Sequence, residues 1–282
     1  MKELQLSCAD FTFPLLPHDK VLRLIAMLGF KGVDVGLFSG RSHLTAESEF
    51  PQISKQAKNL KKKAGDCGLI VADIYLQLDN DLAKYAVNHP DKKRRQFARD
   101  GFLKLLDYAK EAGADHITCL PGMQFEKVEP LDVSIGRSYD ELSWRIEQSN
   151  AMELSFSVEV HVGSPFLGLK AVMALVKAVP ELRLTLDYTH FIRNGFSQNN
   201  VDSLLQYANH FHARGARKAK LQTSMTENVI DYKDIIRKMK SMQYSGWIGL
   251  EYIWIAWEQC NQVDTLSETI RLKKVIEAAY AG

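Results

Sequence analysis

Two periodicities of apolar and polar positions alternate along this chain. Short runs rich in β-branched and apolar residues are typical of buried strands, and longer segments with an apolar residue every third or fourth position are typical of amphipathic helices. The predicted strands are residues 4–13, 32–38, 69–77, 116–120, 157–161, 184–190, 210–214 and 248–252. The predicted helices are residues 18–30, 52–68, 91–113, 139–152, 167–179, 200–209, 231–242 and 267–280.

Strand and helix alternate eight times, with no change of composition, linker or low-complexity segment between the units. Alternating strands and helices indicate a mostly parallel sheet, and eight units favour a closed barrel over an open sheet. No Gly-x-Gly-x-x-Gly motif follows the first strand, which argues against a dinucleotide-binding fold. We therefore predict one α/β domain over residues 1–282, an eight-stranded parallel (β/α)8 TIM barrel.

Two loops are less regular than the rest. Residues 39–51 are longer than a plain connection, and loops of this kind can build the site of a barrel. Residues 123–138 have no readable pattern. We therefore leave the role of the second loop open.

Composition changes this picture little. The chain is 46% hydrophobic and 25% charged, as expected of an ordinary protein with a sizeable core. The net charge is +2, so the chain lacks the dominant basic field of a nucleic-acid binder. We expect neither a signal peptide nor a membrane span, because no long apolar run follows the charged N-terminal residues or occurs elsewhere. The four cysteines are scattered, which favours reduced thiols and a cytoplasmic protein.

Four chemically active residues come at the ends of four successive predicted strands. They are Glu159, Asp187, His212 and Glu251, spaced by 28, 25 and 39 residues. Each spacing is about the length of one strand with its return helix, since such a unit has about 30 residues or more. In a barrel, groups at the carboxyl ends of the strands converge on one face. These four side chains are therefore expected to meet.

Three carboxylates and one imidazole form an oxygen-rich ligand set. Such a set suits Mn²⁺, Mg²⁺ or Co²⁺, and Zn²⁺ is also possible. Any one acidic residue late in a strand can instead be an ion-paired or solvated rim residue. Four potential ligands at consecutive strand ends instead point to a divalent metal ion, with manganese the preferred candidate.

Three further residues are candidates for substrate binding. His190 follows Asp187 by three residues and can bind substrate or orient a ligand; the alternative is a surface histidine. Arg214 shares a barrel face with His212 because strand side chains repeat with a period of two. Its guanidinium can hold a substrate oxyanion, or it can be a structural partner of a carboxylate. His161 stands in the same relation to Glu159, as a weaker candidate.

Two other groups of residues have less certain roles. His116 begins its strand, at the end of the barrel away from the expected site, and we interpret it as structural. Aromatic rings gather around the last strand, where they can wall a sugar pocket or pack the barrel. These aromatic residues are Trp247, Tyr252, Trp254 and Trp257.

The sequence resembles the xylose isomerase-like barrels, a family that includes sugar-phosphate isomerases and epimerases, hydroxypyruvate isomerase, inosose dehydratase and endonuclease IV. The matching segments are residues 28–34 (LGFKGVD), 158–161 (VEVH), 186–190 (LDYTH), 211–214 (FHAR) and 246–251 (GWIGLE). The resemblance implies one divalent metal on Glu159, Asp187, His212 and Glu251. It also implies, from the ketose epimerases, that Glu159 and Glu251 are the proton-transfer pair.

The predicted function is therefore that of a metal-dependent isomerase or epimerase. Its substrate would be a small keto-sugar, a polyol or a sugar phosphate, and proton transfer would pass through a metal-stabilised enediolate. Loss of a β-hydroxyl group would instead give an inosose dehydratase-like lyase. By family analogy the protein is also a possible homo-oligomer.

Two alternatives from other classes stay open. Endonuclease IV shares the Glu, Asp-x-x-His, His, Glu order, but it needs further histidines to hold three zinc ions. Here the third strand offers Tyr75 and Gln77, and the fourth offers Cys119. The second alternative is a non-catalytic sugar-binding barrel, against which the intact ligand set speaks.

Overall fold

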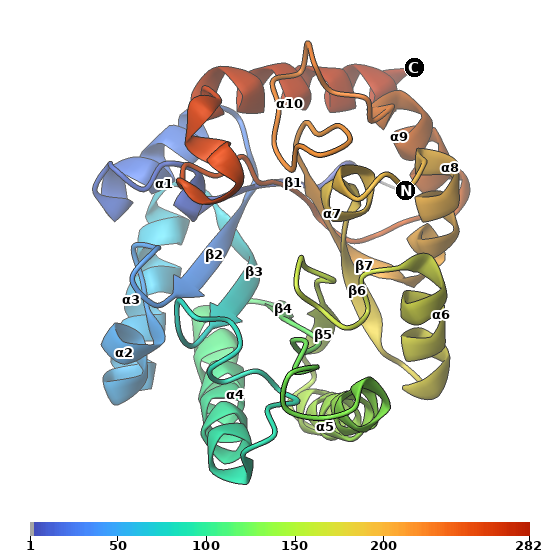
Figure 1. Cartoon of the computed structure of the whole chain (residues 1–282). Coiled ribbons are helices and arrows are strands. Elements are labelled where there is room, and N and C mark those ends of the chain that lie inside the picture. The colour runs from blue at the N-terminus through green and yellow to red at the C-terminus, as the bar shows by residue number, and fades with distance from the viewer. Residues whose placement is uncertain (1–2) are drawn as a thin grey trace.

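The computed structural model describes residues 3–282, and its eight strands close into a parallel barrel (Figure 1). Each strand pairs with its sequence neighbours, and the last pairs with the first. The strands are β1 (Leu6–Ala9), β2 (Gly32–Phe38), β3 (Ile70–Gln77), β4 (His116–Cys119), β5 (Ser155–Val158), β6 (Arg183–Asp187), β7 (Ala208–Ala213) and β8 (Ile248–Leu250). The predicted (β/α)8 fold is confirmed.

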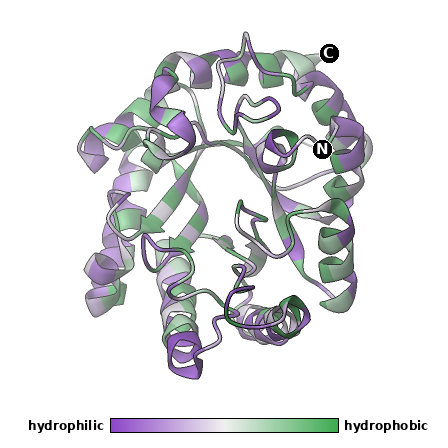
Figure 2. Ribbon diagram, in the orientation of Figure 1, coloured by the Kyte–Doolittle hydropathy of each residue, from purple (hydrophilic) through white to green (hydrophobic). Residues whose placement is uncertain are grey.

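Helices form the outer layer, and the more polar residues of many of them face away from the barrel (Figure 2). The α-helices are α1 (His18–Met27), α2 (Ala46–Glu49), α3 (Ile53–Asp66), α4 (Lys92–Ala112), α5 (Leu131–Ala151), α6 (Leu169–Ala178), α7 (Tyr188–Arg193), α8 (Gln198–Val201), α9 (Tyr232–Ser241) and α10 (Thr265–Ala281). The 3₁₀ helices are η1 (Asp10–Thr12), η2 (Phe50–Gln52), η3 (Asp202–Tyr207) and η4 (Trp257–Gln262). Within residues 3–282, no helix is long and apolar enough to cross a membrane.

Several boundaries differ from the prediction. The first strand ends at Ala9, where η1 takes over, and the Asp10 side chain accepts a hydrogen bond from the Gly36 backbone at 3.1 Å. The predicted helix over 139–152 begins earlier, at Leu131. Its first turns bury small polar side chains such as Ser134 and Ser138, so no apolar periodicity marked them. The predicted helix over 200–209 is instead α8 followed by η3.

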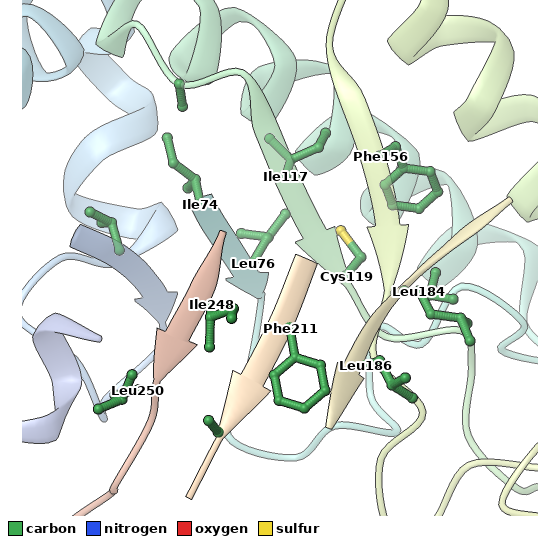
Figure 3. Packing of buried hydrophobic residues seen from close by; sticks show 14 of the residues in the cluster. Ile74, Leu76, Ile117, Cys119, Phe156, Leu184, Leu186, Phe211, Ile248 and Leu250 are labelled. Carbon is green, nitrogen blue, oxygen red and sulfur yellow. The ribbon is translucent and has the colours of Figure 1, made fainter. Parts of the chain in front are cut away.

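The strands present apolar side chains to the helix layer. These residues belong to the main hydrophobic cluster, which also contains the buried faces of the helices. Figure 3 labels ten of them on β3 to β8, namely Ile74, Leu76, Ile117, Cys119, Phe156, Leu184, Leu186, Phe211, Ile248 and Leu250. Burial of this layer supplies the main driving force for folding.

The residues between them point into the barrel and are mostly polar. They bond across the interior: His116 Nδ1 lies 2.6 Å from Asp73, and His116 Nε2 lies 2.8 Å from the Ser157 hydroxyl. His210 Nε2 lies 3.0 Å from Asp34 Oδ2 on the far side of the barrel. Most barrels of this fold fill this space with branched apolar residues. His116 is thus part of a buried polar layer, as its structural interpretation predicted.

Candidate active site

The four predicted ligands lie at the carboxyl ends of neighbouring strands. Glu159 and Glu251 directly follow β5 and β8, Asp187 is the last residue of β6, and His212 lies near the end of β7. All four are at most 6% exposed. The barrel therefore delivers them to one face, as the alternation of strands and helices requires.

His212 lies between the two glutamates. Its Nδ1 is 2.7 Å from Glu159 Oε1 and 2.9 Å from Glu251 Oε2. The geometry gives the hydrogen bond of Nδ1 to Glu159, and Glu251 Oε2 is buried without a hydrogen-bond partner in residues 3–282. Burial alone would favour the neutral imidazole, but the Glu251 and Glu159 carboxylates hold the pKa of His212 well above its usual value. The cluster therefore attracts positive charge.

Asp187 makes its hydrogen bonds to residues outside this cluster. Its Oδ2 accepts a hydrogen bond from Arg214 Nη2 at 2.8 Å, and its Oδ1 accepts one from the Thr189 backbone at 2.8 Å. Burial raises the pKa of Asp187 to about 6, against the opposing effect of Arg214. The structure thus groups Glu159, His212 and Glu251 within 4.8 Å of one another, while Asp187 lies beside them in an ion pair.

The buried Arg214 belongs to both the ion pair and the site. Besides Asp187, its Nη1 lies 4.0 Å from Glu251 Oε1. Burial would raise the pKa of Glu251, but His212 and Arg214 hold it at about 2. The structural partnership proposed from the sequence is therefore present, and Glu251 is held as a carboxylate.

Both candidate histidines lie beside the cluster. His190 is fully buried rather than a surface residue, and its Nε2 lies 3.5 Å from Asp187 Oδ2 and 3.9 Å from Glu159 Oε2. His161 packs beside it, with ring centroids 4.6 Å apart. Burial lowers the pKa of each ring, so both are neutral near pH 7.

A cavity opens above this cluster, with about 480 Å³ of empty space including its mouth. Its lining residues are Phe11, Phe38, Arg41, Tyr75, Gln77, Glu159, His161, Arg214, Glu251, Ile253, Ile255 and Trp257. A second cavity of about 490 Å³ shares Gln77 but is lined by none of the seven candidate site residues. We therefore assign the candidate active site to the first cavity.

Three lining residues were not predicted as functional or were left ambiguous. The Tyr75 hydroxyl donates to Glu159 Oε2 at 2.8 Å, and the period-two pattern of its strand could have placed it inside the barrel. Trp257 stacks on His161 at 5.1 Å, so it walls the cavity. Arg41 lies in the loop after β2, which gave no sequence signal beyond its length.

The loop that carries Trp257 is held by an ion pair. Glu258 has a backbone φ of 52°, a left-handed conformation that costs energy for a residue with a Cβ. Its carboxylate accepts two hydrogen bonds from Arg193, at 3.0 Å from Nε and 2.5 Å from Nη2. This contact connects the β8–α10 loop to α7 and fixes the wall of the cavity.

The donor set fits a divalent cation. Two carboxylates and one imidazole converge, and one carboxylate oxygen is buried without a partner among the described residues. Buried charges are normally paired or bound to a metal ion. A third carboxylate, Asp187, lies next to the cluster, and oxygen ligands with one nitrogen suit Mn²⁺ or Mg²⁺. The same carboxylates can also accept and return protons.

Comparisons with known proteins agree with this architecture. The sequence profile of the xylose isomerase-like TIM barrel family matches residues 22–274. No curated protein sequence matches the chain.

Solved structures with the same fold are distant in sequence. L-ribulose 3-epimerase is 14% identical with a TM-score of 0.76, covering 98% of this chain and 96% of its own. D-psicose 3-epimerase, solved in the presence of D-fructose, is 13% identical with a TM-score of 0.76, covering 99% of this chain and 100% of its own. The probable 3-DHS dehydratase AsbF of Bacillus anthracis is 15% identical with a TM-score of 0.71, covering 96% and 99%. At such identities the likeness shows the fold.

Proposed function

The chain belongs to the xylose isomerase-like TIM barrel family, and we propose that it is a divalent-metal-dependent isomerase or epimerase. Its substrate would be a small keto-sugar, a polyol or a sugar phosphate. The similarity to sugar epimerases supports this reaction class. The observation that carries the proposal is the position of Glu159 and Glu251, which flank His212 Nδ1 at 2.7 and 2.9 Å in the floor of the cavity.

The proposed metal ligands are Glu159, Asp187, His212 and Glu251. A divalent cation held there would polarise a substrate carbonyl and make the neighbouring C–H bond more acidic. To bind the metal ion, Asp187 would have to give up part of its contact with Arg214.

Glu251 is the proposed base, because its carboxylate lines the cavity and is ionised at neutral pH: burial would raise its pKa, but His212 and Arg214 hold the pKa below its usual value. Glu159 is the proposed partner that returns the proton on the other side of the substrate. Tyr75 holds Glu159 in place: burial and the adjacent carboxylate keep the pKa of Tyr75 well above its usual value, so its hydroxyl stays a donor.

The remaining candidates have supporting roles. His161 and Arg214 line the cavity and are proposed to contact substrate hydroxyl or carbonyl oxygens. His190 lies behind them, within 3.5 Å of both Asp187 and Arg214, and is proposed to orient this pair. Its neutral ring adds no charge to the site.

The direct test is exchange of a substrate C–H hydrogen with solvent. Mn²⁺-loaded protein in D₂O is incubated with a panel of keto-sugars, sugar phosphates and inososes, and the products are analysed by NMR and mass spectrometry. We expect deuterium at the carbon next to the carbonyl of one class of substrate. Return of the proton to the other carbon identifies an isomerase, and inversion at the same carbon identifies an epimerase.

A lyase is the second candidate from the same site, supported by the likeness to a probable dehydratase. Loss of a β-hydroxyl group uses the same initial proton abstraction, so Glu251 would keep its role. The exchange experiment separates the two, because a lyase yields a product lighter by one water. Absence of exchange, isomerisation and water loss across the panel would contradict the proposed reaction class.

A further inference from the structure

We propose that Arg41 forms an anion-binding subsite in the catalytic cavity, and that the substrate therefore carries a carboxylate or phosphate group. The inference rests on the proposed function only in placing the substrate in this cavity. It narrows the substrate class, because neutral sugars and polyols offer no group that matches the subsite.

Arg41 is held in place by an ordered loop. Its backbone N–H donates to the Phe38 carbonyl at 3.1 Å. Ser42 fixes the same turn: its hydroxyl donates to the Gly36 carbonyl at 2.7 Å and accepts from the Phe38 backbone at 2.9 Å. The guanidinium carbon lies 5.1 Å from the centre of the Phe38 ring, which also lines the cavity. These contacts thus hold the Arg41 side chain in place at the wall of the cavity.

One edge of the Arg41 guanidinium makes no hydrogen bond to the described residues. Arg41 Nε and Nη2 are buried and have no hydrogen-bond partner among the described residues. These two nitrogens lie on the same side of the guanidinium, so their N–H groups are the parallel pair that binds a carboxylate or phosphate with two hydrogen bonds. Buried donors without partners are costly, so a small shift of the side chain that opens this edge to the cavity, which Arg41 lines, would let it bind an anion.

The two buried arginines Arg145 and Arg214 do not share this feature. Arg145 Nη1 donates to Glu141 Oε2 at 2.8 Å, and Arg214 is paired with Asp187. Arg41 makes no ion pair with any residue in the range 3–282. Burial lowers the pKa of its guanidinium, and Tyr75 and Glu251 oppose this only in part. Its positive charge therefore has no direct partner within the cavity.

The net charge of the site also favours an anionic substrate group. The site and its immediate surroundings hold the carboxylates of Glu159, Asp187 and Glu251 and the guanidiniums of Arg41 and Arg214. A divalent cation on the carboxylates would leave this group with one net positive charge. An anionic substrate group would neutralise it in a partly buried space, where an uncompensated charge is unfavourable.

The test is calorimetric binding of three probes to Mn²⁺-loaded protein: D-ribulose, D-ribulose 5-phosphate and 2-keto-D-gluconate. We expect the wild type to bind the phosphate or the carboxylate probe at least about tenfold more tightly than D-ribulose, since a paired charged contact is worth that much or more. The Arg41→Met variant should lose this preference. The Arg41→Lys variant should keep only part of it, because an ammonium group cannot form the paired contact.

The matched control is Arg217→Met, which removes the same charge from a side chain that is 42% exposed and does not line the cavity. This control should keep the wild-type preference. Equal binding of all three probes by the wild type, or an anion preference that survives in Arg41→Met, would overturn the proposal. Which anionic probe binds identifies the chemical group.

Thermal unfolding of the metal-free proteins separates binding from structure. Because Arg41 Nε and Nη2 are buried without hydrogen-bond partners in residues 3–282, Arg41→Met should melt at or above the wild-type temperature. A melting temperature well below that of both the wild type and Arg217→Met would make Arg41 a structural residue and overturn the subsite.

The subsite and the proposed function can fail separately. Anion binding that depends on Arg41, without exchange of any substrate C–H hydrogen in D₂O, would support the subsite and contradict the isomerase. Exchange of D-ribulose 5-phosphate or 2-keto-D-gluconate that is no faster than exchange of D-ribulose, and equally fast in the wild type and Arg41→Met, would support the isomerase and contradict the subsite.

Discussion

Replacing Glu251 by glutamine is expected to lower turnover by about a thousandfold or more while leaving the fold intact. Glutamine has nearly the same volume but cannot accept a proton, and loss of a positioned general base alone costs about 10²- to 10⁴-fold. The substitution also removes a negative charge from the His212 cluster, where Glu251 Oε2 lies 2.9 Å from Nδ1. Both the base and a proposed metal ligand are weakened at once.

The rate of C–H exchange in D₂O measures this effect, on whichever substrate the panel identifies. The matched control is Glu227→Gln on the surface, where the carboxylate is 58% exposed. The control should exchange at the wild-type rate, and both variants should melt as cooperatively as the wild type. More than about a tenth of the wild-type rate in Glu251→Gln would show that another residue is the base.

Replacing Gly249 by alanine is expected to lower the free energy of unfolding by about 2–4 kcal/mol, because it inserts a methyl group into the polar interior of the barrel. A Cβ at this position would lie 1.9 Å from Asp34 Oδ2 and 3.2 Å from His210 Nε2. The Asp34–His210 hydrogen bond would have to break or shift. Because the His210 ring centre lies 5.3 Å from that of His212, the disturbance should reach the site.

Denaturant unfolding of the metal-free protein measures this loss. Gly136→Ala is the control, since Gly136 lies within α5 and a Cβ there would meet nothing within 4 Å. This control should gain about 0.5–1 kcal/mol from helix propensity. Equal stability of Gly249→Ala and the wild type would mean that the Asp34–His210 pair does not require the glycine.

The fold could be predicted because its signals are local and repeated. Eight strands and the helices between them each show their own periodicity, and the connection rule for parallel strands leaves few topologies. The errors lie where the local signal is weak. The start of α5 at Leu131 buries serines, and η1 at Asp10 ends the first strand through a side-chain hydrogen bond to Gly36.

The site could be predicted in part for the same reason. Glu159, Asp187, His212 and Glu251 each end a strand, so the topology alone brings them to one face. The polar layer inside the barrel was not predicted, because the strands were interpreted as apolar runs with a polar residue only at the end. The pairing of Asp187 with Arg214 was one of two interpretations that spacing could not separate. Arg41 could not be found, because its position depends on the conformation of a loop.

The measurement that tests the central claim most directly is the metal content of protein purified without chelator, determined by elemental mass spectrometry. The control is the Glu159→Ala/Asp187→Ala double variant. We predict about one manganese, magnesium, cobalt or zinc ion per chain, lost in the control, because these carboxylates are proposed ligands of a single centre. No metal in the wild type, even after loading with Mn²⁺, would contradict a metal-dependent reaction, and about three zinc ions per chain would instead favour the nuclease alternative.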